Sequence, residues 1–204
     1  MNNEVVLHGN QIQYKNIAVI GHSQLPTQIP TYREAIRYHV FRVPGATVDH
    51  FRYHETFREF WNYSYDITII FIGGNDIANT HCAALKAKLK KLYDDVINKD
   101  KYVIPCTLEH RVYTVPYHGR FITTTESYNR VSRSINQNLV RHFRFRNIEY
   151  IHLQRHTFIS ERSGDGIHFG FRAQDRLIEL IVKRVHRKLN LQIPYHQYPR
   201  NARE

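Results

Sequence analysis

Apolar residues along the chain form two kinds of segment, short continuous runs and longer stretches with helical spacing, and the two kinds alternate. Continuous runs at 16–20 and 66–72, each followed by glycine, predict buried strands. An alternating run at 38–43 that ends at Pro44-Gly45, and shorter runs at 102–105 and 148–153, predict three more strands. Apolar positions three and four apart predict helices over 48–61, 82–97, 125–142 and 174–189, with a short helical piece over 31–38.

Strands that alternate with helices, and inner strands that are apolar on both faces, are typical of a parallel sheet covered by helices. We therefore predict an α/β fold, a three-layer α/β/α sandwich with a parallel five-stranded sheet of flavodoxin-like type. The predicted domain spans residues 16–190, between an N-terminal extension at 1–15 and a C-terminal tail at 191–204.

Composition excludes several classes of protein. The chain has 204 residues, of which 42% are apolar and 13% aromatic, so it is too apolar to be disordered. Its two cysteines, Cys82 and Cys106, cannot form a disulfide scaffold. The run at 67–72 is far too short for a membrane span, and the first residues lack the features of a signal peptide. We expect an intracellular protein, in the cytoplasm.

Polar residues follow the predicted strands at four places, all expected at one edge of a parallel sheet. They are Gly21-His22-Ser23-Gln24, Pro44-Gly45-Ala46-Thr47, Gly73-Gly74-Asn75-Asp76 and Gly164-Asp165-Gly166-Ile167-His168. Together they supply a hydroxyl, an imidazole, a carboxylate, a side-chain amide and backbone N–H groups, which are the components of a serine hydrolase. Taken singly, each has an ordinary explanation as a helix cap or a turn.

These four blocks resemble the SGNH hydrolases, also called GDSL-type esterases, over roughly residues 16–190. The resemblance implies that Ser23 is the nucleophile, that His168 is the general base and that Asp165 orients His168. It also implies that the N–H groups of Ser23 and Gly45 and the side chain of Asn75 hold the oxyanion. It implies a small acyl-ester substrate, with neither a cofactor nor a metal ion.

One position departs from the family pattern, because His22 stands where the first block usually has Asp. This substitution puts the efficiency of the site in question more than its mechanism. Within the family, the sequence most resembles SGNH domains carried by animal mobile elements. It is also similar to the SGNH-like domain of Oskar, which lacks the catalytic residues and binds RNA.

The net charge of +11 favours polyanionic partners and leaves a second function open. Basic residues gather in the predicted helices over 82–97 and 125–142, and aromatic residues interrupt the second group, as in His142-Phe143-Arg144-Phe145-Arg146. Arginine with aromatic residues is the chemistry of single-strand binding. The alternative prediction is therefore a catalytically weak or silent module that binds RNA or other nucleic acid through Lys86, Lys90, Lys91, Arg133, Arg141, Arg144 and Arg146. A scaffold for protein partners is a further alternative, favoured only by the aromatic residues of the C-terminal tail.

Overall fold

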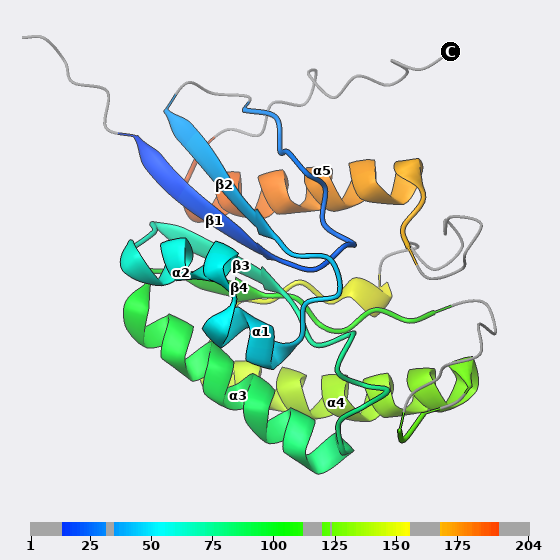
Figure 1. The fold of residues 1–204 in the computed structure, drawn as a ribbon. Coiled ribbons are helices and arrows are strands. Elements are labelled where there is room, and N and C mark those ends of the chain that lie inside the picture. Colours follow the sequence, from blue (N-terminus) through cyan, green and yellow to red (C-terminus); the bar gives the residue numbers. More distant parts are fainter. Residues whose placement is uncertain (1–13, 32–34, 112–119, 123, 156–167, 192–204) are drawn as a thin grey trace, which may run out of the picture.

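Four parallel strands form the central sheet of the computed structural model, which describes residues 14–31, 35–111, 120–122, 124–155 and 168–191. The strands are β1 (Lys15–Gly21), β2 (Ile36–Arg42), β3 (Ile67–Phe71) and β4 (Val103–Pro105), in the order β2-β1-β3-β4 (Figure 1). Within β1 and β3, the residues from Ile17 to Ile20 and from Ile67 to Ile70 are fully buried, because helices or loops cover both faces of the sheet. The predicted α/β fold with a parallel sheet is confirmed.

The predicted fifth strand is reduced to one bridged residue, Ile151, beside Cys106 at the β4 edge. The Ile151 N–H donates to the Pro105 carbonyl at 2.9 Å, and the Ile151 carbonyl accepts from the Thr107 N–H at 2.9 Å. Pairing stops there because the Leu153 N–H donates to the Thr107 hydroxyl instead of to a backbone carbonyl. Leu153–Arg155 then turn into the short 3-10 helix η1. Ile151 nevertheless extends the sheet beyond β4, from the segment in which the fifth strand was predicted.

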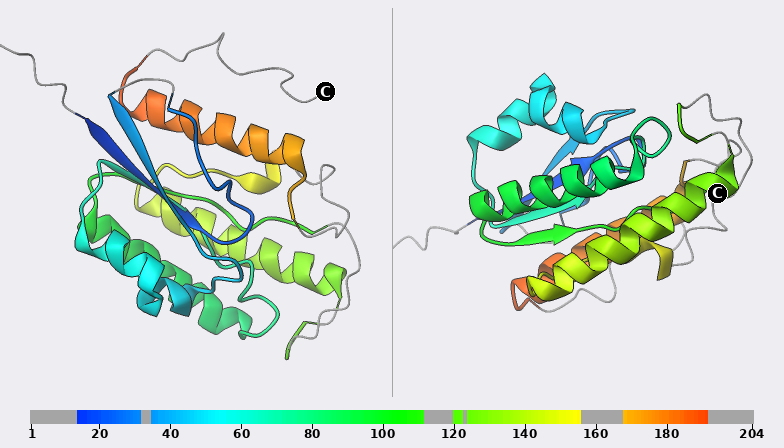
Figure 2. Two further views of the ribbon diagram at one scale, coloured as in Figure 1. Left: turned by 45° about the horizontal axis from the view of Figure 1, so that its top comes forward. Right: turned by 90° about the horizontal axis from the view of Figure 1, so that it is seen from below.

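Helices cover the two faces of the sheet unequally (Figure 2). One face packs against α1 (Val48–Tyr53), α2 (Glu55–Asn62), α3 (Cys82–Lys99) and α4 (Thr125–Phe145). The other face packs against α5 (Phe171–Lys188) and against Leu25 and Ile29 from the β1–β2 connection. This connection takes the place of a second helix on the α5 face, so the third layer is built from one helix and one loop.

Two of the predicted helices differ from the structure. The prediction of a helix over 31–38 is wrong at 36–38, because Ile36 begins the strand that pairs residue by residue with β1. The predicted helix over 48–61 is broken at His54, whose backbone is extended (φ −71°, ψ 138°). His54 is the C-cap of α1, where its N–H donates to the His50 carbonyl. It is also the N-cap of α2, where its ring accepts from the Thr56 N–H at 3.2 Å.

The strands all end at the same edge of the sheet, and the loops that leave them carry three of the four blocks singled out above. The helices α2, α3, α4 and α5 end at the opposite edge, where the strands begin (Figure 1). We call these the strand-end edge and the strand-start edge. Residues 1–13 of the predicted extension, residues 192–204 of the predicted tail and residues 164–167 of the fourth block lie outside the described residues, whereas Lys15 belongs to β1.

Candidate active site

Ser23 and His168 meet at the strand-end edge, although 145 positions separate them in the sequence. The Ser23 Oγ lies 3.0 Å from the His168 Nε2, which is hydrogen-bond distance. Ser23 follows β1, and His168 lies three residues before α5. Both side chains are half-buried. A hydroxyl at this distance from an imidazole can pass its proton to the ring as it attacks an electrophile.

Gly21 ends β1 at a point where no side chain fits. A Cβ on this residue would lie 2.4 Å from the Phe71 carbonyl oxygen and 2.8 Å from a Leu25 methyl carbon. The close approach lets β1 and β3 run together to the edge of the sheet before the chain turns. Ser23, two residues later, therefore emerges directly above the ends of the central strands.

His22 packs beneath the turn that carries Ser23 and accepts a hydrogen bond from its backbone. Its side chain is buried against the Phe71 ring, with the ring centroids 4.7 Å apart. Its Nδ1 accepts the Gln24 N–H at 3.4 Å. The imidazole therefore lies beneath the turn and holds backbone that follows Ser23. Nothing in this packing places the His22 ring between Ser23 and His168.

Two residues that the sequence analysis did not single out hold the Ser23 and His168 loops. Gln24 is buried, and its side-chain oxygen accepts the Phe169 N–H at 2.8 Å. This bond joins the residue after Ser23 to the residue after His168. Arg42, at the end of β2, donates from Nη2 to the Ser23 carbonyl at 3.1 Å. In the sequence, the only indication of this supporting role was the position of Gln24 directly after the predicted nucleophile.

The second and third blocks lie against each other on the other side of this edge. The Asn75 Nδ2 donates to the Ala46 carbonyl at 3.0 Å, which leaves its second amide hydrogen for another acceptor. Gly45 has a φ of +72°, a backbone conformation that residues with a side chain rarely adopt, and it is exposed. Its N–H has no hydrogen-bond partner among the described residues. The Asn75 side chain thus lies against the backbone of the residue that follows Gly45.

Asp76, the next residue after Asn75, ties the third block to α1. It is buried, and both of its carboxylate oxygens lie within 3.2 Å of the Val48 nitrogen, in the first turn of that helix. Burial raises the pKa of the Asp76 carboxyl to about 7, against an opposing effect of the Val48 N–H. On the other side of the same loop, the Tyr128 hydroxyl donates to the Gly74 carbonyl at 3.2 Å. The loop that carries Asn75 is thus held from both sides.

The remaining predicted site residues fall elsewhere. Asp165, the predicted partner of His168, lies outside the described residues. The predicted nucleic-acid-binding residues lie on α3, on α4 and directly after α4, all of them away from Ser23. Lys86 donates to the Ser134 hydroxyl at 3.0 Å, and Arg133 donates to the Asn129 carbonyl at 3.2 Å. These two cations are therefore held along the helix surface.

Neither a metal site nor a membrane span emerges from the described residues. Across these ranges, no three His, Cys, Asp or Glu side chains gather in a way that could hold a metal ion. No helix in the same part of the chain is long and apolar enough to cross a bilayer.

Comparison with known proteins agrees with the fold and the loops. Residues 21–176, more than half of the chain, match the GDSL-like lipase/acylhydrolase family. The chain belongs to this family. It has the SGNH hydrolase fold, and its family is one of serine esterases and acylhydrolases. No curated protein matches the sequence.

Solved structures share this fold at low sequence identity. A lipolytic protein of the G-D-S-L family from Veillonella parvula is 16% identical, with a TM-score of 0.64 over 85% of this chain and 99% of its own. The esterase EstA from Pseudoalteromonas sp., solved with monoethylphosphonate as inhibitor, is 14% identical, with a TM-score of 0.60 over 86% and 99%. A catalytic mutant of the acetylxylan esterase Axe2 from Geobacillus stearothermophilus is 14% identical, with a TM-score of 0.60 over 87% and 95%.

Proposed function

We propose that this chain is a serine ester hydrolase in which Ser23 and His168 act on a small acyl ester. The observation that carries the proposal is the 3.0 Å separation of Ser23 Oγ and His168 Nε2. Membership of the GDSL-like lipase/acylhydrolase family supports it, as does the likeness to structures of an esterase and an acetylxylan esterase. The narrower resemblance to SGNH domains of animal mobile elements stays a prediction.

In the first half of the reaction, the Ser23 Oγ attacks the ester carbonyl carbon while the His168 Nε2 takes the hydroxyl proton. The resulting tetrahedral intermediate collapses when the carbon–oxygen bond to the alcohol breaks. His168 gives its proton to the departing alkoxide, and the acyl group remains on Ser23. Asp165, close to His168 in the sequence, takes the role of holding the imidazole with its proton on Nδ1.

In the second half, water attacks the acyl-serine and His168 takes a proton from it. The serine oxygen leaves with that proton, and the carboxylic acid is released. In both halves the carbonyl oxygen becomes negatively charged, and it is stabilised by the Gly45 N–H, the Ser23 N–H and the Asn75 side chain. One such donor is worth about 3–4 kcal/mol of transition-state stabilisation. The mechanism needs neither a cofactor nor a metal ion.

Hydrolysis of p-nitrophenyl acetate and butyrate tests the proposal. We expect Ser23→Ala to lower kcat about a thousandfold or more while the melting temperature stays unchanged. Ser134→Ala is the matched control, because Ser134 is an exposed serine on α4 that contacts Lys86. Because the 14 histidines of the chain can cleave such activated esters weakly, the test is the difference in kcat between the two variants. Equal rates for Ser23→Ala and Ser134→Ala would refute the proposal.

The alternative prediction, nucleic-acid binding through α3 and α4, uses none of these residues. It is compatible with hydrolysis, because the basic helices and the Ser23–His168 pair occupy different parts of the molecule. Its partners would be RNA or other nucleic acid.

A further inference from the structure

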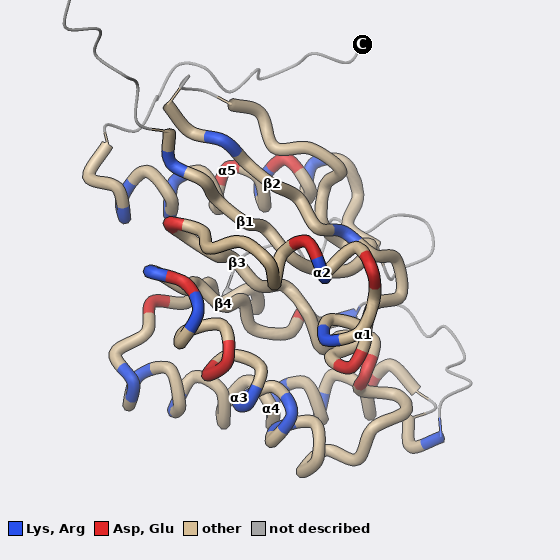
Figure 3. Tube along the Cα trace, turned by 60° about the vertical axis from the view of Figure 1, so that its left-hand side comes forward, with Lys and Arg blue, Asp and Glu red and all other residues tan. Residues whose placement is uncertain are grey.

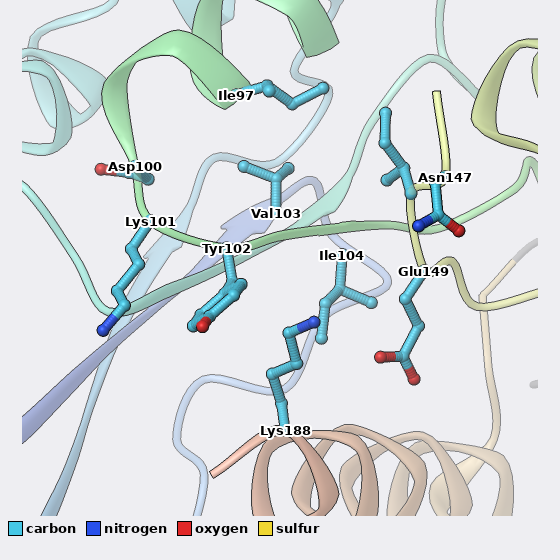
Figure 4. Close-up of a pocket in the computed structure, with 10 residues that line it drawn as sticks. Ile97, Asp100, Lys101, Tyr102, Val103, Ile104, Asn147, Glu149 and Lys188 are labelled. Carbon is cyan, nitrogen blue, oxygen red and sulfur yellow. The ribbon is translucent and has the colours of Figure 1, made fainter. Parts of the chain in front are cut away.

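A pocket of about 160 Å³ opens at the strand-start edge, opposite the candidate active site. It is lined by residues around the start of β4, by the segment that follows α4 and by the end of α5 (Figure 4). Tyr102 lies between Lys101 and Lys188 in this pocket. The Lys188 Nζ is 4.4 Å and the Lys101 Nζ 5.5 Å from the centroid of the Tyr102 ring, which is 37% exposed. Two ammonium groups thus flank one accessible aromatic ring.

A second exposed aromatic residue, Phe145, stands between two arginines in the sequence where α4 ends. Phe145 is 88% exposed, and its neighbours Arg144 and Arg146 are exposed too. The chain then turns at Asn147, which has a φ of +52° and lines the pocket. We call this set of residues the edge surface: Lys101, Tyr102, Arg144, Phe145, Arg146 and Lys188. Its two parts are linked by Asn147, which follows Arg146 in the chain and lines the pocket that holds Tyr102.

Acidic residues near this edge are paired with cations, and one of these cations, Arg146, belongs to the edge surface itself. The Glu149 carboxylate, inside the pocket, accepts from Arg184 at 2.8 Å. Asp100 is buried and bonds to the Lys99 Nζ at 2.8 Å. Asp94 lies 3.4 Å from the His142 ring and 3.7 Å from Arg146. Figure 3, which brings this side of the molecule forward, shows basic and acidic positions interspersed along it.

Lys101, Arg144 and Lys188, by contrast, have no acidic partner within ion-pair distance in the described part of the chain. Cations in the last turn of a helix are favoured by the helix dipole, which accounts for Arg144 and Lys188 in part. The dipole does not account for the exposed phenyl ring of Phe145. It also does not account for Lys101, which lies beyond the end of α3.

We propose that the edge surface binds single-stranded nucleic acid, independently of the hydrolysis proposed above. Lys101, Arg144 and Lys188 contact phosphates, while bases stack on Phe145 and on the accessible part of Tyr102. Unspecific single-strand binding combines these two elements, a basic track and aromatic platforms. A membrane surface fits less well, because the Tyr102 ring lies between two ammonium groups and Arg144 and Arg146 flank Phe145 in the sequence, so the edge surface is basic as well as aromatic. The site also differs from the helix faces predicted from the sequence, with which it shares only Arg144 and Arg146.

Fluorescence anisotropy with labelled oligouridylate and oligothymidylate tests this proposal, with the full chain carrying Ser23→Ala so that hydrolysis plays no part. We expect a Kd that weakens between about 50 and 200 mM salt, with a log–log slope near −2 for about three phosphate contacts. The triple variant K101Q/R144Q/K188Q should weaken binding at least about tenfold and flatten the slope. The matched control is K86Q/K90Q/K91Q on α3, which removes the same charge and should weaken binding less than about threefold.

The aromatic residues provide a second measurement that charge alone does not explain. Phe145→Ala should weaken binding about fivefold or more and leave the salt slope unchanged, because base stacking releases no counterions. Phe145 is exposed, so the variant should fold normally, which circular dichroism checks. If K101Q/R144Q/K188Q and K86Q/K90Q/K91Q weaken oligonucleotide binding equally, the proposal is overturned. The absence of binding at about 50 mM salt would overturn it too. Binding to phosphatidylserine vesicles without binding to either oligonucleotide would overturn it in favour of a membrane surface.

Discussion

Replacement of Gln24 by Met should slow catalysis while keeping the nucleophile and the base in the chain. Gln24 is 1% exposed, and its side-chain oxygen accepts the Phe169 N–H at 2.8 Å. Methionine has nearly the same shape but no oxygen, so the variant leaves the Phe169 N–H without this acceptor. His168 is the residue directly before Phe169, and its imidazole is the group that must stay 3.0 Å from Ser23.

The magnitude follows from the loss of one buried hydrogen bond. Leaving a buried donor unsatisfied costs about 1–3 kcal/mol of stability. In a chain of this size, each kcal/mol lowers the melting temperature by about 2–4 °C. A shift of the His168 loop by about 1 Å is enough to cost on the order of a hundredfold in rate. We therefore expect kcat to fall about 10- to 100-fold, with KM changed less than about threefold.

The assay compares Gln24→Met with Thr68→Val, a control that loses a buried hydrogen bond at the other edge of the sheet. Thr68 is fully buried, and its hydroxyl donates to the Asp100 carboxylate. Both variants should melt at lower temperature, but only Gln24→Met should lose kcat when assayed well below its melting temperature. If the two variants lose stability equally and both keep the wild-type kcat, Gln24 does not position His168 and the reasoning is wrong.

Two further predictions concern buried ionisable groups. Burial raises the pKa of Asp76 to about 7. Between about pH 4 and 7, the folded state therefore keeps a proton that the unfolded chain has released. The stability of the folded state falls as the pH rises through this window. Between pH 5 and 8, the free energy of unfolding measured in urea should fall by about 2–3 kcal/mol more for the wild type than for Asp76→Asn. Parallel pH profiles of the two proteins would contradict this prediction. Burial likewise raises the pKa of the Cys106 thiol, whereas Cys82 is half-buried. N-ethylmaleimide should therefore modify Cys82 before Cys106 in the native protein, as peptide mass spectrometry would show, and the reverse order would contradict the packing.

The sequence predicted the layers of the fold well, because the apolar runs of β1 and β3 are long and both of their faces are buried. It failed where a single backbone contact decides the outcome. The break at His54 depends on one ring capping α2, and nothing in the apolar spacing signals it. The predicted fifth strand pairs only at Ile151, because the Leu153 N–H donates to the Thr107 hydroxyl instead of to a strand carbonyl. Ile36 looked helical locally, but pairing with Lys15 determined its conformation.

The candidate site shows the same division. Ser23 and His168 could be singled out because their loops follow strands that a parallel sheet brings to one edge. Gln24, Arg42 and Asp76 were missed as supporting residues, because their partners Phe169, Ser23 and Val48 are backbone groups. A backbone partner leaves no residue type to recognise in the sequence. The edge surface around Tyr102 was missed for a different reason, since it joins residues from the segment before β4, from the end of α4 and from the end of α5, which are far apart in the sequence.

The pairing of Ser23 with His168 is the central claim, and covalent labelling with a fluorophosphonate tests it most directly. The reagent reacts only with an activated serine, and peptide mapping identifies the residue that carries it. We predict a single adduct on the peptide that contains Ser23, formed at least about a hundredfold more slowly in His168→Ala. An adduct on another serine, or equal labelling rates with and without the His168 imidazole, would contradict the account.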